Sequence, residues 1–228
     1  MQIPTFYYQQ IYNPFREIFH ENRDGEKHLD KGELVQTLSN NHQTIYHYIR
    51  RGSVSLSITT EEGYRKMLLL CGENMIFPIY RDGADYKTNH TIEFQVRENL
   101  TADILYESHL RQLLLAHPDF LMRTLNVALD VLDLYTYDAA NSSYNDSFVS
   151  VCNLLYLLWK QMPETGSPKK LPVSHSDISY ATGYSRPQVS KQINRLSREN
   201  IVATGYNSLT ILDAHRLAEC CSYDVRED

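Results

Sequence analysis

The polar stretch Ser185-Arg186-Pro187-Gln188-Val189-Ser190-Lys191 carries the side chains whose chemistry is easiest to interpret. Arginine and lysine supply positive charge, glutamine supplies a paired donor and acceptor, and serine supplies hydroxyls. Together these groups bind the phosphates and the base edges of nucleic acids. The stretch therefore predicts contacts with a nucleic acid.

Two short helices joined by a sharp turn would position this stretch. Residues 177–182 begin as a helix after Ser174 and Ser176, and serine is a favourable N-cap residue. Gly183 allows the turn, because glycine adopts backbone conformations that a side chain hinders. Ser185 is a second N-cap candidate, and Pro187 falls in the first helical turn, where a missing N–H has little effect. The pattern is helix, turn, helix.

The second helix is amphipathic, and a hairpin follows it. Its apolar side holds Val189, Ile193, Leu196 and Ile201, and its polar side holds Gln188, Lys191, Asn194, Arg195 and Arg198. Residues 201–204 and 209–212 flank the turn Gly205-Tyr206-Asn207-Ser208 as the strands of a wing. A helix-turn-helix places the N-terminal residues of its second helix on base edges in the major groove.

The charge distribution favours the same segment. The net charge of the chain is −6, yet residues 163–212 hold six basic and three acidic side chains, a net of +3. A basic module in an acidic chain is typical of a polyanion-binding unit, because phosphates attract Lys and Arg.

The first half of the chain has the pattern of an all-β unit. Residues 53–58 and 92–96 alternate polar and apolar side chains, the period of a half-buried strand. Turns at Arg50-Arg51-Gly52 and Gly72-Glu73-Asn74 bound short strands, one of them from Tyr64 to Cys71. We expect a meander of short strands that closes into a roll or barrel.

Helices follow the strands. A short helix over 106–116 precedes a long one from Phe120 to about Ala140. One apolar stripe of the long helix has heptad spacing: Leu121, Leu125, Ala128, Leu132, Tyr135 and Ala139. A second stripe holds Phe120, Val127, Val131 and Leu134. Because a helix that is apolar on two sides needs two partners, we expect the β unit on one side and a second copy of the helix on the other. A buried helix in a monomer is the alternative.

A further helix over about 148–161 precedes residues 163–172, whose three prolines predict a connecting loop. The domain join is expected between about 140 and 148.

Composition excludes several classes of protein. A chain with 42% hydrophobic and 22% charged residues is ordinary for a folded soluble protein. No apolar run is long enough for a membrane helix, and the start lacks a signal-peptide pattern, so a cytoplasmic location is expected. The vicinal pair Cys220-Cys221 is expected to be two ordinary reduced thiols in a frayed tail.

An enzyme with a cupin-like roll is an alternative class. It would need a His/Glu metal set on adjacent strands. His42, His47 and His90 are scattered, without an HxH or HxxxH pair. We therefore expect neither enzymatic activity nor a bound metal.

Three groups of residues resemble the Crp/Fnr transcription-factor family, named for the cyclic-AMP receptor protein, over nearly the whole chain. They are Gly52-Ser53-Val54 with Glu61-Glu62-Gly63, then Pro118-Asp119-Phe120-Leu121-Met122-Arg123, and the stretch 185–191. The layout is most similar to anaerobic Firmicute members, including those that respond to halogenated phenols.

The resemblance implies an α+β fold in three parts. Residues 1–116 would form an N-terminal double-stranded β-roll, cupin-like or cyclic-nucleotide-binding-like, with flanking helices. Residues 117–144 would form the long dimerisation helix, and residues 145–228 the C-terminal winged helix-turn-helix that binds DNA.

The resemblance also implies an effector between the roll and the long helix. Matched positions are Phe77, Tyr80 and Tyr86 from the roll and Tyr135 and Thr136 from the helix. Tyrosines suit a small aromatic or phenolic ligand. Residues 77–91 lack the Arg-Ser pair that binds a cyclic phosphate, so cyclic AMP is not expected. The alternative is that the tyrosines only pack and no effector is bound.

No cofactor is predicted. The family's iron–sulfur sensors use N-terminal cysteines, and this chain has none before Cys71. Cys71 and His90 lie in the region where the haem-binding branch has its ligands, but a lone strand cysteine is expected to be core.

On DNA, the resemblance gives roles to six residues: Ser185, Arg186, Gln188, Ser190, Lys191 and Arg195. Arg186 matches an arginine that contacts bases or phosphates, and Lys191 replaces a guanine-reading arginine. Gln188 could pair with adenine, and the serines could reach phosphates. Pro187 replaces the family's glutamate, so contact with cytosine is lost and the half-site is expected to depart from the family's consensus.

These observations predict a homodimeric, sequence-specific transcription regulator gated by a small effector other than cyclic AMP. Expected partners are double-stranded DNA with a palindromic operator, a second copy of the chain and RNA polymerase, and no membrane. The alternative is a DNA-binding dimer that is independent of an effector or regulated by a partner protein.

Overall fold

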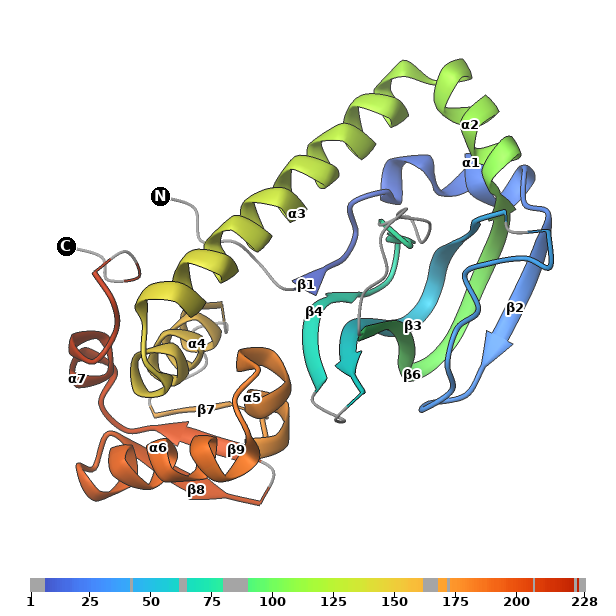
Figure 1. The fold of residues 1–228 in the computed structure, drawn as a ribbon. Coiled ribbons are helices and arrows are strands. Elements are labelled where there is room, and N and C mark those ends of the chain that lie inside the picture. Colours follow the sequence, from blue (N-terminus) through green and yellow to red (C-terminus); the bar gives the residue numbers. More distant parts are fainter. Residues whose placement is uncertain are drawn as a thin grey trace. The chain divides into compact units, whose positions relative to one another are not determined.

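The computed structural model describes residues 7–41, 43–61, 65–79, 90–161, 168–171, 173–206, 208–223 and 225. The chain forms two compact units. One is Pro4–Leu134, and the other is Tyr135–Asp228 together with Met1–Ile3. Figure 1 labels the elements of both.

Two long antiparallel strands organise the first unit, β3 (Ile45–Thr60) and β6 (His90–Tyr106). The sheet order is β1-β4-β3-β6-β2, and β5 also pairs with β3. The remaining strands are short: β1 (Tyr7–Tyr8), β2 (Gly25–Leu29), β4 (Arg65–Cys71) and β5 (Ile76–Phe77). The expectation of separate short strands on either side of residues 50–52 is therefore wrong, because β3 runs through them.

A bulge at Gly52 lets β3 continue through this point. The register between β3 and β6 shifts around Arg51 and Ser53. Gly52 has φ +94°, and a Cβ there would clash with the carbonyl oxygen of Asn99. Only glycine accepts this conformation and this close approach without strain. The residues that suggested a turn instead bend one long strand.

An aromatic cluster fixes the start of the long helix on the roll. The first unit also contains the 3₁₀ helix η1 (Asn13–Phe15), α1 (Arg16–Glu21), α2 (Glu107–Ala116) and the first part of α3 (Pro118–Tyr144). The buried ring of Phe120 on α3 packs edge-on against Phe19 at 5.2 Å and Tyr12 at 5.7 Å between ring centroids. Burial of such a side chain contributes about 1.5–3 kcal/mol.

A buried carboxylate adds a polar link inside the roll. Asp103 on β6 is fully buried and lies 3.2 Å from Arg50 Nε and 3.8 Å from Arg23 Nε. Because a buried charge is tolerated when it is paired, this cluster is part of the roll's structure.

The second unit is a helical cluster on a small sheet. It contains α4 (Ser147–Gln161), α5 (His175–Thr182), α6 (Arg186–Arg198), α7 (Ala214–Glu219) and a sheet of order β7-β9-β8, formed by β7 (Lys169–Leu171), β8 (Val202–Gly205) and β9 (Ser208–Ile211). Its core includes Leu155, Ile178, Val189, Ile193 and Leu209. β7 corrects the expected loop, because Lys169–Leu171 pairs with β9 as an edge strand.

The C-terminal cysteines also correct an expectation. Cys221 is only 2% exposed and its thiol donates to the carbonyl of Leu217 at 3.3 Å. Val225 is equally buried in the same core. This segment therefore packs into the second unit and is not a frayed tail.

None of the helices in the described part of the chain combines the length and apolar character that crossing a bilayer requires.

Candidate nucleic-acid interface

The first helix of the motif, α5, begins and ends at capping residues. The hydroxyl of Ser174 accepts from the backbone N–H of Asp177 at 3.2 Å, and the Asp177 carboxylate accepts from the Ser174 N–H at 2.9 Å. This reciprocal arrangement is a capping box. The helix ends at Gly183, whose φ of +76° gives the left-handed conformation that glycine favours. The predicted sharp turn is confirmed.

The recognition helix, α6, presents a polar face from a buried base. Val189, Ile193 and Leu196 are fully buried, whereas Arg186, Gln188, Lys191 and Asn194 are not. Ser185 is its N-cap, and Pro187 lies in its first turn. The predicted amphipathic pattern is therefore confirmed, and the side chains available to a polyanion lie on one face.

Two of the predicted contact residues bond to each other. The side-chain oxygen of Gln188 accepts from the backbone N–H of Ser185 at 3.0 Å and from its hydroxyl at 2.8 Å. Pairing with adenine needs both the oxygen and the nitrogen of a glutamine amide. Gln188 could read adenine only if these two bonds opened or were shared.

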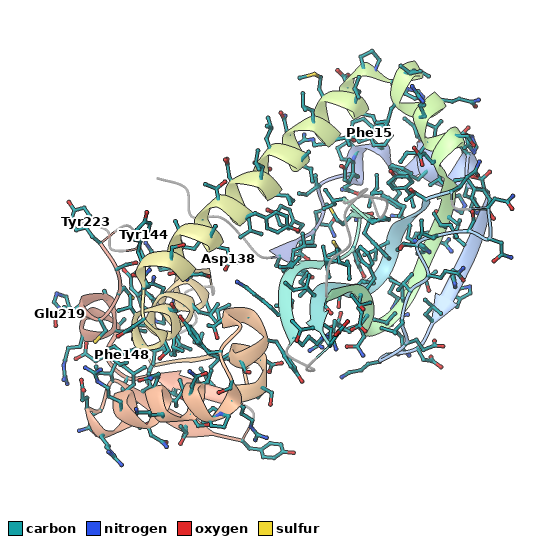
Figure 2. All side chains as sticks on the ribbon, viewed as in Figure 1. Phe15, Asp138, Tyr144, Phe148, Glu219 and Tyr223 are labelled. Atoms are coloured by element: carbon teal, nitrogen blue, oxygen red, sulfur yellow. The ribbon has the colours of Figure 1, made fainter. Side chains whose placement is uncertain are left out.

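Ser190 and Arg195 contact other parts of the unit. The hydroxyl of Ser190 lies 2.9 Å from Nδ1 of His175 on α5. The guanidinium of Arg195 lies 3.7 Å from the ring centroid of Phe148, and its Nε lies 3.4 Å from the Glu199 carboxylate. Phe148, labelled in Figure 2, belongs to α4. These three contacts stabilise packing within the unit.

The lysines of the basic segment also differ in their surroundings. Lys169 lies over the Trp159 ring at 4.8 Å and donates to the carbonyl of the same residue at 3.5 Å. In contrast, Lys191 is exposed on α6. The net charge of the sequence indicated the region but not which cations face outward.

The wing is the hairpin β8–β9. Its strands pair from Val202 with Ile211 to Gly205 with Ser208. Tyr206, in the turn, is 94% exposed. An exposed aromatic ring at the tip of a wing has no role in the core.

The heptad stripe of α3 is largely exposed. The buried side of the helix is Phe120, Val127, Val131 and Leu134, the stripe expected to pack on the β unit. In the heptad stripe, Leu121, Leu125 and Leu132 are exposed, Leu132 by 59%, and Tyr135 is half-buried; Ala128 and Ala139 complete it. Met122 and Leu129 are also about half exposed and widen the stripe, although neither falls on the predicted heptad positions.

The structure describes three of the five predicted effector residues. Phe77 is fully buried and stacks on His47 at 4.9 Å and on Phe94 at 5.4 Å. Tyr80 and Tyr86 lie outside the described residues. Tyr135 is half-buried and Thr136 exposed, and both belong to the second unit, so the effector site stays a prediction.

The cofactor candidates are core residues where they are described. Cys71 is buried in β4, and burial raises the pKa of its thiol to about 12. His42 and the side chain of His90 lie outside the described residues. Among the residues described, no three His, Cys, Asp or Glu side chains gather as a metal site.

Solved structures share the fold. A structure of CprK complexed with OCPA is 20% identical, with a TM-score of 0.69, covering 89% of this chain and 92% of that chain. A CooA mutant from Carboxydothermus hydrogenoformans is 16% identical, with a TM-score of 0.75 and coverage of 94% and 100%. CLP of Xanthomonas campestris, described as c-di-GMP responsive, is 15% identical, with a TM-score of 0.74 and coverage of 88% and 99%. No curated protein sequence matches the chain.

The capped recognition helix, its sharp turn and the wing define a winged helix-turn-helix, a DNA-binding class of protein. Residues 151–220 match the family described as the Crp-like helix-turn-helix domain. The chain therefore contains a Crp-like DNA-binding domain, and its fold is shared with the solved structures named above.

Proposed function

We propose that two copies of this chain bind a palindromic DNA operator and that a small effector controls their affinity for it. The observation that carries the proposal is the polar outer face of α6, with Arg186 and Lys191 near its start. A helix of this kind enters the major groove with its N-terminal residues on base edges. Ser185, Arg186, Gln188 and Lys191 are the proposed contacts, with Ser190 and Arg195 in supporting positions.

The exposed leucines of α3 support a homodimer. Leu121, Leu125 and Leu132 repeat at heptad spacing and remain exposed, while the opposite stripe is buried. Contiguous exposed apolar residues are unfavourable in a monomer. A parallel copy of the same helix would cover them as a coiled-coil seam.

Two similar structures support an effector, because one is described as complexed with OCPA and the other as c-di-GMP responsive. For this chain we propose a small aromatic or phenolic compound near Phe77, Tyr80, Tyr86, Tyr135 and Thr136. Cyclic AMP is not proposed, because residues 77–91 lack the Arg-Ser pair.

The gating mechanism would act through spacing. Two recognition helices must be one helical turn of DNA apart, about 34 Å, to contact both half-sites. An effector can shift the dimer toward that spacing only by its differential affinity for the two arrangements. We further propose action on DNA in the cytoplasm, with RNA polymerase as a partner and no catalytic activity.

Selection of bound sites from random DNA tests the proposal most directly. We expect a recovered two-fold symmetric sequence whose affinity falls steeply with salt, because phosphate contacts release counterions. Binding without sequence preference and without a salt slope would contradict the proposal.

The second candidate function is a DNA-binding dimer without an effector. Phe77, one of the proposed effector residues, is fully buried and stacks on His47 and Phe94, which favours a residue that only packs. A thermal-shift screen with phenols, nucleotides and haem distinguishes the two functions. A compound that raises both the melting temperature and the operator affinity supports gating, and uniformly flat shifts support the second candidate.

A further inference from the structure

A polar pocket of about 330 Å³ lies within the winged helix-turn-helix unit. It is formed by the start of α5, α6 and the wing. Its polar lining includes His175, Ser176, Arg186, Asn194, Thr204 and Ser208. Figure 1 shows α5 and α6 beside the strands β8 and β9 that contribute to it.

A buried hydroxyl in this pocket has no partner within the described residues. Ser208 is 6% exposed, and its Oγ is buried without a hydrogen bond to any described group. The side chain belongs to β9 and lines the pocket. A buried hydroxyl without a partner is unfavourable. This hydroxyl is therefore a donor that an acceptor group entering the pocket could satisfy.

The charged groups around the pocket favour an anion. Arg186 supplies a guanidinium from α6, and His175 supplies an imidazole from the first turn of α5. Nδ1 of His175 faces the Ser190 hydroxyl at 2.9 Å, so its Nε2 is the second ring nitrogen available to a ligand. On α5, Asp177 accepts from Ser174 in the capping box, and the wing residues that line the pocket carry no titratable side chain.

We propose that this pocket binds one phosphate group of the DNA backbone and that His175 takes up a proton when the phosphate enters. The proposal rests on the proposed DNA-binding function. A tetrahedral oxyanion accepts from a guanidinium, an imidazolium and a hydroxyl together. We assign the anion to a phosphodiester of the DNA backbone and not to a free phosphate ion. The reason is that Arg186 belongs both to the pocket and to the start of the recognition helix.

Proton uptake fixes the direction of the pH dependence. Burial, with the nearby charge of Arg186, lowers the pKa of His175 in the free protein. A bound phosphate raises that pKa, because an adjacent anion favours the charged imidazole. DNA affinity is therefore greatest at low pH and falls as the pH rises through the interval between the free and the bound pKa.

The first test measures DNA affinity between about pH 8 and pH 6, the range in which a histidine changes charge. For wild-type protein on a duplex recovered by selection, we expect about tenfold tighter binding at the lower pH, equivalent to a pKa shift of one unit. His175→Gln keeps a hydrogen-bonding group but cannot take up a proton, so it should flatten this dependence. His215→Gln, at an exposed histidine of α7, is the matched control and should keep it. Equal pH dependence in all three proteins would overturn the proposal.

The second test uses Ser208→Ala. Removal of an unpaired buried hydroxyl should leave the melting temperature unchanged or raise it, while DNA affinity falls severalfold. A duplex with a neutral methylphosphonate at one backbone position should weaken wild-type binding but not weaken the variant further. A lower melting temperature with unchanged DNA affinity would mean that Ser208 is only structural and would contradict the pocket.

Inorganic phosphate separates the two sources of the anion. We expect it to compete weakly with DNA in wild-type protein and not in Ser208→Ala. Tight phosphate binding that does not compete with DNA would overturn the backbone assignment. Loss of the pH dependence with sequence-specific binding intact would contradict this inference alone, whereas no DNA binding under any condition would contradict the proposed function as well.

Discussion

The basic side chains of the recognition helix differ in the contacts that they make within the folded unit. Lys191 is exposed on α6, whereas Arg195 lies over the Phe148 ring and beside Glu199. The two residues are one helical turn apart and carry the same charge. Only the contacts of the folded unit distinguish them.

Substitution of these two residues should therefore change different quantities, DNA affinity for Lys191 and stability for Arg195. Lys191→Ala should weaken specific DNA binding by about 1–3 kcal/mol and leave the free energy of unfolding unchanged. Arg195→Ala should lower the free energy of unfolding by about 0.5–1 kcal/mol, because it loses its contact with the ring. Fluorescence anisotropy with a selected duplex and urea denaturation measure the two quantities. An unchanged DNA affinity in Lys191→Ala would remove this residue from the reading set.

His47 predicts an acid-sensitive roll. The ring is buried against Phe77, and burial, with the charge of Lys27, lowers the pKa of His47 to about 4. An unfolded histidine ionises near pH 6.5. As the pH falls from about 6.5 to 4, the unfolded chain takes up a proton that the folded chain does not, and the free energy of unfolding falls by about 3 kcal/mol.

A substitution isolates this contribution. His47→Phe keeps an aromatic ring beside Phe77 and should flatten the acid limb of stability measured by urea denaturation at a series of pH values. The exposed-site variant His28→Gln should keep that limb. If wild-type protein and His47→Phe lose stability in parallel, carboxylates and not His47 are responsible.

Local signals at single residues were well predicted by the sequence. Gly183 and Ser185 have strong positional preferences, and each ends or caps a helix as expected, while the expected capping serine of α5 is Ser174 and not Ser176. The bond between Ser190 and His175 joins residues 15 apart on two helices, and no local pattern encodes it. The pairing of Ser208 with Gly205 likewise depends on the register of the β8–β9 hairpin, which no local pattern encodes.

At the scale of elements, the two apolar stripes of α3 differ in burial. The stripe of Phe120 is buried and the stripe of Leu132 is exposed. Leu132→Glu should convert the dimer into a monomer and weaken operator binding at least about tenfold, because both half-sites must be engaged together. Light scattering after size exclusion gives the mass.

A matched control is Leu115→Glu, which places the same charge on an exposed leucine of α2. It should leave the mass unchanged. A wild-type protein that is monomeric at micromolar concentration would contradict the seam.

Elements with strong periodicity could be predicted, and those defined by pairing could not. Heptad spacing indicated α3 over most of its length, and alternation indicated parts of β3 and β6. β7 was missed because three residues between prolines are too few to show an alternating pattern. These residues form a strand because they pair with β9. The continuity of β3 was missed because an Arg-Arg-Gly sequence is typical of both a turn and a bulge.

At the scale of the whole molecule, charge asymmetry predicted a polyanion-binding unit within residues 163–212, and these residues belong to the compact unit that carries the winged helix-turn-helix. The fold was predictable because each part carried its own local pattern. The effector residues stay a prediction, because an effector site depends on long-range packing and because Tyr80 and Tyr86 lie outside the described residues.

The native thiols make the protein suitable for site-directed spin labelling. Cys71, Cys152 and Cys221 are buried, Cys220 is half-buried, and burial raises the pKa of Cys152 and Cys220. Maleimide and methanethiosulfonate reagents attack thiolates, so these cysteines should stay unmodified in the native state. A probe attached through Asn194→Cys would then report the separation of the two recognition helices directly, in solution, with and without each candidate compound.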